Sequence, residues 1–160
     1  MKSYPAFNTK IYSLNLNNTN IEGDVADLPV VTYMLDLTNT NITSTTSQLI
    51  SLLSEKEGGL IIDNSQINLY GSGMPNYAIG THPNITWKNC SIVVSQLNLL
   101  LKYLNETNTI NGTLDIAGSN PEITSTSALD NINSLIDKGW TVLYNAAVSD
   151  WTYEGVMTVG

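Results

Sequence analysis

Two residue types that often carry nucleophilic chemistry, cysteine and histidine, occur once each in the 160-residue chain. Cys90 and His82 are eight positions apart, and a thiol is activated only when its base lies within hydrogen-bond reach. The local pattern puts Cys90 inside a turn and His82 ahead of a strand, so we expect no catalytic pair. A G-x-S-x-G nucleophile elbow is absent from the sequence. We therefore predict that Cys90 is a buried, unreactive packing residue.

Three aspartates, Asp36, Asp63 and Asp115, follow apolar residues in corresponding parts of the chain. Paired carboxylates can hydrolyse glycosides or hold Ca²⁺. Asp36 and Asp63 are expected in different rows of side chains, and Asp115 lies two strands beyond Asp63, so we interpret all three as solvated side chains. A glycan-active enzyme using them is our weakest hypothesis. No nucleotide loop, zinc spacing or EF-hand loop occurs, so we predict no catalytic residues, no metal and no cofactor.

The elements that must position these residues repeat along the chain. Residues 14–21 read apolar-x-apolar-x-x-small-x-apolar, and this pattern returns five times at intervals of 21–29 residues. Its six copies begin at Leu14, Leu35, Leu60, Ile85, Leu114 and Thr141. The small positions are Thr19, Thr40, Ser65, Cys90, Ser119 and Ala146. A period in the twenties with one short strand per period is typical of a solenoid.

The segments that lead back from one strand to the next are expected to differ. Residues 21–29 are too short for a helix that Pro29 would also stop, so an extended or 3₁₀ return is expected. An apolar face followed by two glycines predicts a helix over Ser47–Lys56. Glycine and proline punctuate the segment 70–82, which is predicted to be a loop.

Two longer helices are expected in the second half of the chain. Leucines spaced at i, i+3, i+4 and i+7 predict a helix over Val94–Leu104. A second helix is predicted over Ser125–Lys138, capped by Ser127 and ended by Gly139. Its inward-facing residues are expected to be Leu129, Ile132, Leu135 and Ile136.

The six copies, taken together, resemble the leucine-rich repeat family, whose pattern is L-x-x-L-x-L-x-x-N/C-x-L. The match departs from that pattern because hydroxyl residues mostly replace the Asn/Cys position, and because Pro121 displaces an apolar residue that Ile123 is expected to replace. The resemblance implies an α/β solenoid, a right-handed coil with a short parallel sheet on its concave side and helices or loops on its convex side. It implies a single domain over 1–160, with a lead-in at 1–10, about six repeats at 11–148 and a C-terminal cap or tail at 149–160.

The concave face is the predicted binding surface, because solenoids commonly bind partners there. Strand side chains alternate between core and solvent, so with Leu14 and Leu16 inward, Asn15 and Asn17 face outward. The first predicted exposed row is Asn15, Asp36, Ile61, Thr86, Asp115 and Val142. The second is Asn17, Thr38, Asp63, Lys88, Ala117 and Tyr144. The alternative interpretation is that these are simply solvated strand residues, and the loop Tyr70–His82 is a second candidate site.

A further row of asparagines follows the strands and is interpreted as structural. Asparagine tolerates a left-handed backbone and bonds its own main chain, so it suits the turn that ends each strand. The row consists of Asn18, Asn39, Asn64, Asn89 and, after an interruption at Gly118, Asn145.

Charge and composition narrow the classes of partner. The formal net charge of −8 disfavours nucleic acid, which needs a basic surface, and it also disfavours an anionic membrane. No run of about 18 apolar residues occurs, so no membrane insertion is expected. A single cysteine excludes an intrachain disulfide.

The leading functional hypothesis is a non-enzymatic recognition or adhesion module that binds a protein or a surface glycan. Irregular repeats rich in Asn and Thr are loosely similar to those of bacterial surface proteins and bacteriophage virion proteins. An extracellular, cell-surface or virion location is therefore expected. The alternative is a structural assembly or decoration subunit, for example of a bacteriophage particle, that packs on itself or on a larger chain.

Overall fold

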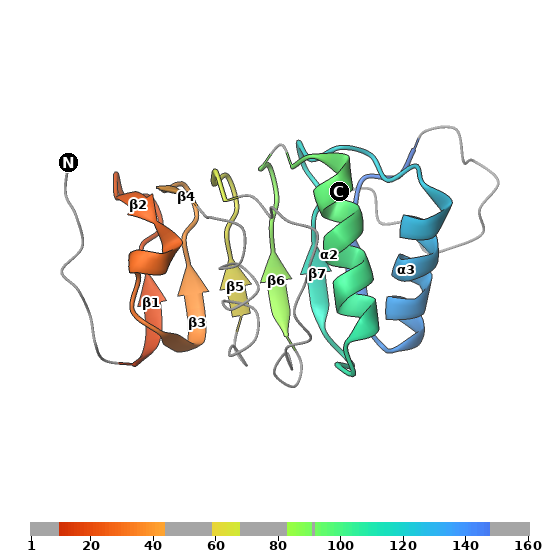
Figure 1. Cartoon of the computed structure of the whole chain (residues 1–160), viewed down its shortest axis with the longest axis horizontal. Coiled ribbons are helices and arrows are strands. Elements are labelled where there is room, and N and C mark those ends of the chain that lie inside the picture. Colours follow the sequence, from red (N-terminus) through yellow and green to blue (C-terminus); the bar gives the residue numbers. More distant parts are fainter. Residues whose placement is uncertain (1–9, 44–58, 68–82, 91, 148–160) are drawn as a thin grey trace.

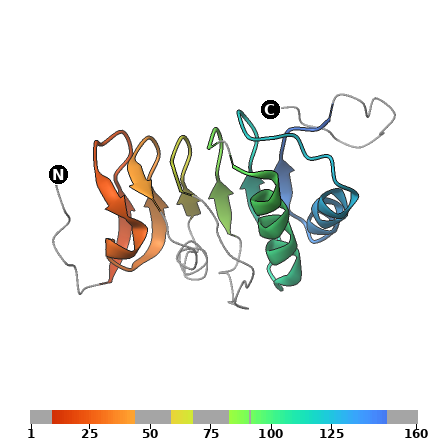
Figure 2. The same ribbon diagram turned by 45° about the horizontal axis from the view of Figure 1, so that its top comes forward.

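The computed structural model describes residues 10–43, 59–67, 83–90 and 92–147, and within these it is an α/β fold built on a parallel sheet (Figure 1). The sheet has six strands in the order of the sequence, β1-β3-β5-β6-β7-β8, and every pairing is parallel. The strands are β1 (Ile11–Asn15), β3 (Val31–Asp36), β5 (Gly59–Ile61), β6 (Asn84–Thr86), β7 (Thr113–Asp115) and β8 (Thr141–Leu143). Figure 2 shows them side by side and pointing the same way. The prediction of about six short parallel strands is confirmed.

The first return segment has the extended and 3₁₀ character expected of it. Residues 22–24 form strand β2 (Glu22–Asp24), which pairs in parallel with β4 (Asn41–Thr43), and the 3₁₀ turn η1 (Val25–Asp27) follows β2. Its last bond runs from the Leu28 amide to the Val25 carbonyl, 3.2 Å away. The predicted helix Ser47–Lys56 and the predicted loop Tyr70–His82 lie outside the described residues.

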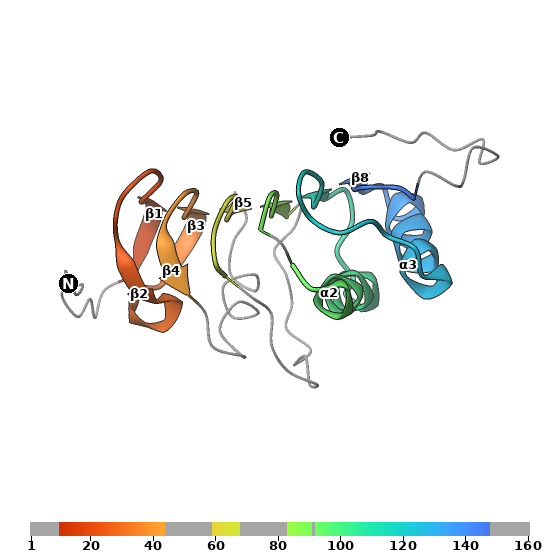
Figure 3. The same ribbon diagram turned by 90° about the horizontal axis from the view of Figure 1, so that it is seen from above.

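Two α-helices lie in the described part of the chain, on one side of the six-stranded sheet (Figure 3). Helix α2 (Val94–Glu106) confirms the leucine periodicity, since the four leucines with the predicted spacing, Leu97, Leu100, Leu101 and Leu104, are at most 1% exposed. Helix α3 (Thr126–Asp137) begins one residue later than predicted and is capped by Ser125, whose hydroxyl accepts from the Ala128 amide at 3.3 Å.

Two expectations for α3 were therefore wrong. Ser127 does not cap the helix; it is exposed within the first turn. Ile136 is 47% exposed rather than inward, whereas Ile132 and Leu135 are buried. The expected stop at Gly139 is confirmed: its φ is +83°, its amide bonds the Ile136 carbonyl, and the Trp140 amide bonds the Leu135 carbonyl. This pair of bonds is the Schellman arrangement that ends many helices.

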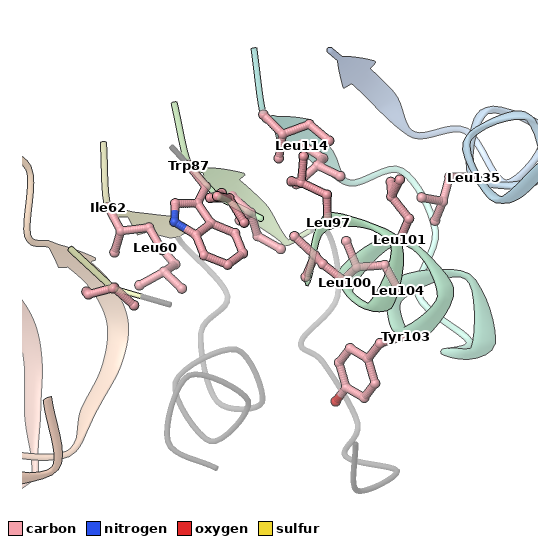
Figure 4. Close-up of a cluster of buried hydrophobic side chains, with 14 of the residues drawn as sticks. Leu60, Ile62, Trp87, Leu97, Leu100, Leu101, Tyr103, Leu104, Leu114 and Leu135 are labelled. Atoms are coloured by element: carbon pink, nitrogen blue, oxygen red, sulfur yellow. The ribbon is translucent and has the colours of Figure 1, made fainter. Parts of the chain in front are cut away.

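The core lies between the sheet and the helices (Figure 4). Ladder pairing places Leu14, Leu35, Leu60, Ile85, Leu114 and Val142 in one column. The second apolar residue of each copy lies two residues further along the chain and forms a second inward-facing column. Its members in the inner repeats are at most 1% exposed: Leu37, Ile62, Trp87 and Ile116. Figure 4 shows Trp87 beside Leu60 and Ile62, facing the leucines of α2.

The last copy of the pattern starts one residue later than predicted. Leu114 pairs with Val142 and Asp115 with Leu143, so the inward residues are Val142 and Tyr144, not Thr141 and Leu143. A shift of one residue reverses the direction of every strand side chain. The predicted outward positions of Val142 and Tyr144 are therefore wrong, since both pack against the core.

Candidate functional site

The open face of the six-stranded sheet, the one opposite α2 and α3, is the candidate site. Its middle row is set by the strand register and is Asn15, Asp36, Ile61, Thr86, Asp115 and Leu143. Five of the six residues predicted for this row are thus brought together. Leu143 takes the place assigned to Val142.

The second row lies just beyond the ends of the strands. There, a backbone amide of one repeat donates to a carbonyl of the next repeat, with N–O distances of 2.9–3.5 Å. The accepting carbonyls are those of Thr38, Asp63, Lys88 and Ala117. With Asn17 at its start, this row matches the prediction, except that Ala117 is buried and Tyr144 belongs to the core.

A third row on this face was missed by the sequence reasoning. It lies two positions before the middle row and consists of Ser13, Met34, Gly59, Asn84, Thr113 and Thr141. The same alternation that placed Asn15 outward also places Ser13 outward, so the signal was present. The Thr113 hydroxyl bonds the side chain of Asn84 across this row.

At the β1 end of the face, short polar side chains are linked by hydrogen bonds to one another and to backbone amides. Asn15 Oδ1 accepts from the Asn17 amide at 3.0 Å, and Asp36 Oδ1 accepts from the Thr38 amide at the same distance. The Asn17 Nδ2 group donates to Asp36 Oδ2 at 2.9 Å. The expectation of a solvated side chain is wrong for Asp36, which is only 8% exposed because Asn17 and Thr38 hold its carboxylate over the end of its strand. Its two hydrogen bonds offset the cost of burying a charge. These side chains are fixed in place without a ligand.

In the middle of the face, Lys88 lies between two carboxylates. Its Nζ is 3.7 Å from Asp63 Oδ2 and 3.5 Å from Asp115 Oδ2. Asp63 Oδ1 also accepts from the Lys88 amide at 2.8 Å, and Asp115 Oδ1 accepts from the Ala117 amide at 3.2 Å. Partly exposed ion pairs add little stability, but this arrangement orients three side chains. Asp63 and Asp115 are thus engaged with Lys88 and with backbone amides.

Three of the small residues after the strands bond main-chain carbonyls, and Cys90 reaches a carbonyl of the preceding repeat. The hydroxyls of Thr19 and Thr40 donate to the carbonyls of Leu16 and Leu37 at 2.6 and 2.8 Å. The Cys90 thiol lies 3.1 Å from the carbonyls of Ile62 and Lys88.

The ladder residue of the fifth repeat is Asn120, not Ser119 as predicted. Asn120 is 4% exposed, and its Nδ2 donates to the carbonyls of Trp87 and Ile116 at 2.6 and 3.0 Å. Its Oδ1 accepts from the amides of Cys90 and Ile92. Asn120 thus lies one residue later in its repeat than Cys90 does. Ile123 lies two residues later than Ile92 and is buried in place of Pro121, as expected.

The asparagine row has the left-handed backbone predicted for it. Asn18, Asn39, Asn64 and Asn89 have φ of +51° to +56°, and Gly118 continues the row at +78°. Asn39 Nδ2 donates to Asn18 Oδ1 at 2.7 Å. The prediction fails for Asn145, which does not have a left-handed backbone; its side chain instead donates to the carbonyls of Gly118 and Asn120 at 2.7 Å. The other members of the row set the turns that follow the strands.

Cys90 has the environment of a packing residue. Burial raises the pKa of its thiol, and the nearby Asp63 carboxylate adds to this rise. The group is therefore a neutral thiol at neutral pH, which suits a donor to carbonyl oxygens and not a nucleophile. The prediction that His82 does not pair with Cys90 concerns a residue outside the described part of the chain.

Comparisons of the chain with protein-family models, with curated proteins and with solved structures found no match. Within the described residues, no group of three or more His, Cys, Asp or Glu side chains is arranged to hold a metal ion. No helix among them is long and apolar enough to cross a membrane. The open face of the six-stranded sheet is therefore the feature that indicates a function.

Proposed function

We propose that the chain is a non-enzymatic recognition module of the leucine-rich-repeat type. Its coil would be a right-handed solenoid, with the open face of the six-stranded sheet as its concave side. The support is the register of the repeated residues, the ladder from Thr19 to Asn120 and the left-handed asparagine row. The partner would be a protein or a surface glycan, and the location extracellular, on a cell surface or on a virion.

The observation that supports binding at this face is that its polar side chains are preorganised. Asn15, Asn17 and Asp36 are joined by hydrogen bonds, and Lys88 lies between Asp63 and Asp115. Side chains that are already fixed lose less entropy when a partner binds, which raises affinity. The closely spaced rows offer donors, acceptors and the apolar Ile61 at about the 4.8 Å strand spacing.

A matched pair of substitutions tests the face. Ile61→Arg places a large charged group in the middle row, whereas Ile136→Arg makes the same change on the exposed side of α3. In a glycan array and in binding assays on bacterial cells or virions, Ile61→Arg should reduce binding at least tenfold, the size expected near the centre of an interface. Ile136→Arg should bind normally. Equal binding by both variants would remove the open face as the site.

The second candidate function is that of an assembly or decoration subunit, and the partly exposed apolar residues of the two edge strands favour it. Leu14 in β1 and Val142 in β8 are partly exposed, whereas their counterparts in the four inner strands are at most 2% exposed. A second copy or a larger chain could cover either end by continuing the ladder. Light scattering over a range of concentrations tests this: a monomer at every concentration contradicts self-association.

A further inference from the structure

Two exposed tyrosines form an ordered pair at the start of the sheet. Tyr12 of β1 and Tyr33 of β3 stack with ring centroids 4.6 Å apart and an angle of 5° between the rings. Contact between ring planes needs only about 3.5–4.0 Å, so the rings are offset, the favourable geometry for aromatic stacking. Tyr12 is 68% exposed and Tyr33 38%. The pair therefore offers ring surface to solvent in a fixed position.

The exposure of these rings is unusual for the place they occupy in the repeat. One residue after Tyr12 the register pairs Ser13 with Met34, and at the other end of the sheet it pairs Thr113 with Thr141. The position of Tyr12 and Tyr33 thus corresponds to Gly112 and Trp140. Trp140 is 3% exposed, packs against Gly112 and donates from its indole nitrogen to the Thr109 carbonyl at 3.2 Å. An aromatic residue at this position is buried at one end of the sheet and exposed at the other.

The backbone beside the tyrosine pair is also irregular. Ile11 pairs with Val31 but Ser13 with Met34, so β3 carries one extra residue opposite Tyr12. Such bulges redirect side chains and are common at sheet edges and beside functional sites. Packing of the core does not require the tyrosines, since neither belongs to the core cluster or to the residues packed against it.

The net charge of the segment that carries the pair, and of the whole chain, indicates what the pair would bind. Residues 10–43 contain four acidic residues, Glu22, Asp24, Asp27 and Asp36, and one basic residue, Lys10. The whole chain carries a net charge of −8. A negative field together with the electron-rich face of an aromatic ring attracts a cation. Arginine fits better than lysine because its planar guanidinium stacks on a ring and is more weakly hydrated.

We propose that the Tyr12–Tyr33 pair is a docking platform for an arginine side chain of a basic polypeptide partner. This inference rests on the proposed recognition function and makes its partner a protein with an exposed basic segment. The guanidinium would lie on the solvent side of Tyr12, whose other side is supported by Tyr33.

The test uses a short Arg-Gly repeat peptide, with lysine and citrulline versions as matched probes. Citrulline keeps the planar shape of the arginine head group and removes its charge. Isothermal titration at low ionic strength should rank affinity as arginine, then lysine, then citrulline. Tyr12→Leu should weaken binding of the arginine peptide by about three- to fivefold, the contribution of an exposed cation–π contact. Tyr12→Phe keeps the ring and should bind within about twofold of the parent chain.

Tyr12→Phe keeps the ring stack and should unfold at the same temperature as the parent. Because Tyr12 is mostly exposed, Tyr12→Leu should stay folded at the assay temperature and lose only the small stabilisation of the stack, which separates loss of the platform from loss of the fold. Asp130→Asn, a charge change on α3, controls for long-range attraction and should alter affinity less than Tyr12→Leu. Equal binding of arginine and citrulline peptides, or no loss with Tyr12→Leu, would overturn the proposal. Binding of neutral oligosaccharides that Tyr12→Leu abolishes would also overturn it in favour of a sugar platform. If Ile61→Arg still prevents partner binding in either case, the recognition function stands while the arginine platform fails.

Discussion

Single polar residues in the turns connect this fold from repeat to repeat. Asn120 is the clearest case, because one buried amide bonds two carbonyls and two amides drawn from two neighbouring repeats. Asparagine is suited to this role because its side chain both donates and accepts. The hydroxyls of Thr19 and Thr40 each donate to one carbonyl of their own repeat. A hydroxyl, a thiol and an amide therefore each donate to main-chain carbonyls at this place in the repeat.

Replacing Asn120 tests this role directly. Asn120→Ala leaves buried carbonyl and amide groups without partners, and should lower the free energy of unfolding by about 2–4 kcal/mol. Ser119→Ala, one residue earlier at an exposed position, should change it by less than about 0.5 kcal/mol. Urea denaturation of the two variants provides the comparison. A larger effect for Ser119→Ala would restore the ladder position expected from the spacing.

The partly buried thiol of Cys90 should make stability depend on alkaline pH. Burial raises its pKa in the folded protein, whereas the unfolded thiol ionises near its ordinary pKa of about 8.5. Above that pH the unfolded state loses the proton first, so the free energy of unfolding should fall as pH rises through this range and be unaffected below it. Cys90→Thr supplies the residue used at Thr19 and Thr40 and removes this titration.

Urea denaturation at neutral pH and at about pH 9.5, with and without Cys90→Thr, isolates the effect because the other titrating groups are common to both proteins. The parent should lose more stability between the two pH values than the variant. An identical loss in both would contradict a raised thiol pKa.

At the scale of single elements, the periodic parts of the chain could be predicted and the insertions could not. Leucine spacing located α2 and the alternation of apolar residues located the strands, because both signals depend only on local geometry. The ladder residue Asn120 was missed because its turn is one residue longer than the spacing predicts. The outward Leu143 was missed because Val142, Leu143 and Tyr144 are all apolar, so alternation alone does not show which of them face inward. Similarly, Ser125 and Ser127 both suit a helix start, and only the backbone conformation decides between them.

The cap of α3 gives a prediction at this scale. Ser125→Ala removes the acceptor for the Ala128 amide and should lower the free energy of unfolding by about 1 kcal/mol. Ser127→Ala, inside the first turn, should be neutral or slightly stabilising because alanine is the better helix former. Thermal unfolding of both variants distinguishes them. Equal destabilisation by the two changes would mean that neither serine alone caps the helix.

For the whole molecule, the candidate site follows from the register more than from any local motif. Asn15, Asp36, Ile61, Thr86 and Asp115 were expected in one row because each follows the first apolar residue of its repeat, and the ladder pairs them as expected. The hydrogen bonds of Asp36 and the position of Lys88 between two carboxylates could not be predicted. They depend on the directions of side chains that are 19–27 residues apart in sequence.

If the repeats stack as proposed, equivalent residues in inner and end repeats should contribute differently to the free energy of unfolding. Leu14 and Leu35 are partners in adjacent strands, but Leu35 is 0% exposed with strands on both sides, whereas Leu14 lies at the edge and is partly exposed. In a stack where each repeat contacts only its neighbours, removing methyl groups inside costs more than removing them at an end. Leu35→Ala should lower the free energy of unfolding by about 2–5 kcal/mol and Leu14→Ala by about half as much or less.

Hydrogen exchange should show the same gradient in the parent protein. Amides in β3 and β6 should be protected by the global free energy of unfolding, and those of β1 should exchange through local fraying of the end repeat. Leu14→Ala should speed exchange mainly in β1, while Leu35→Ala should speed it throughout the described strands, because an inner repeat links both halves of the sheet. Uniform exchange from β1 to β8, with equal costs for the two substitutions, would instead describe a single cooperative core without end effects, and the stacked-repeat architecture would then lose its energetic basis.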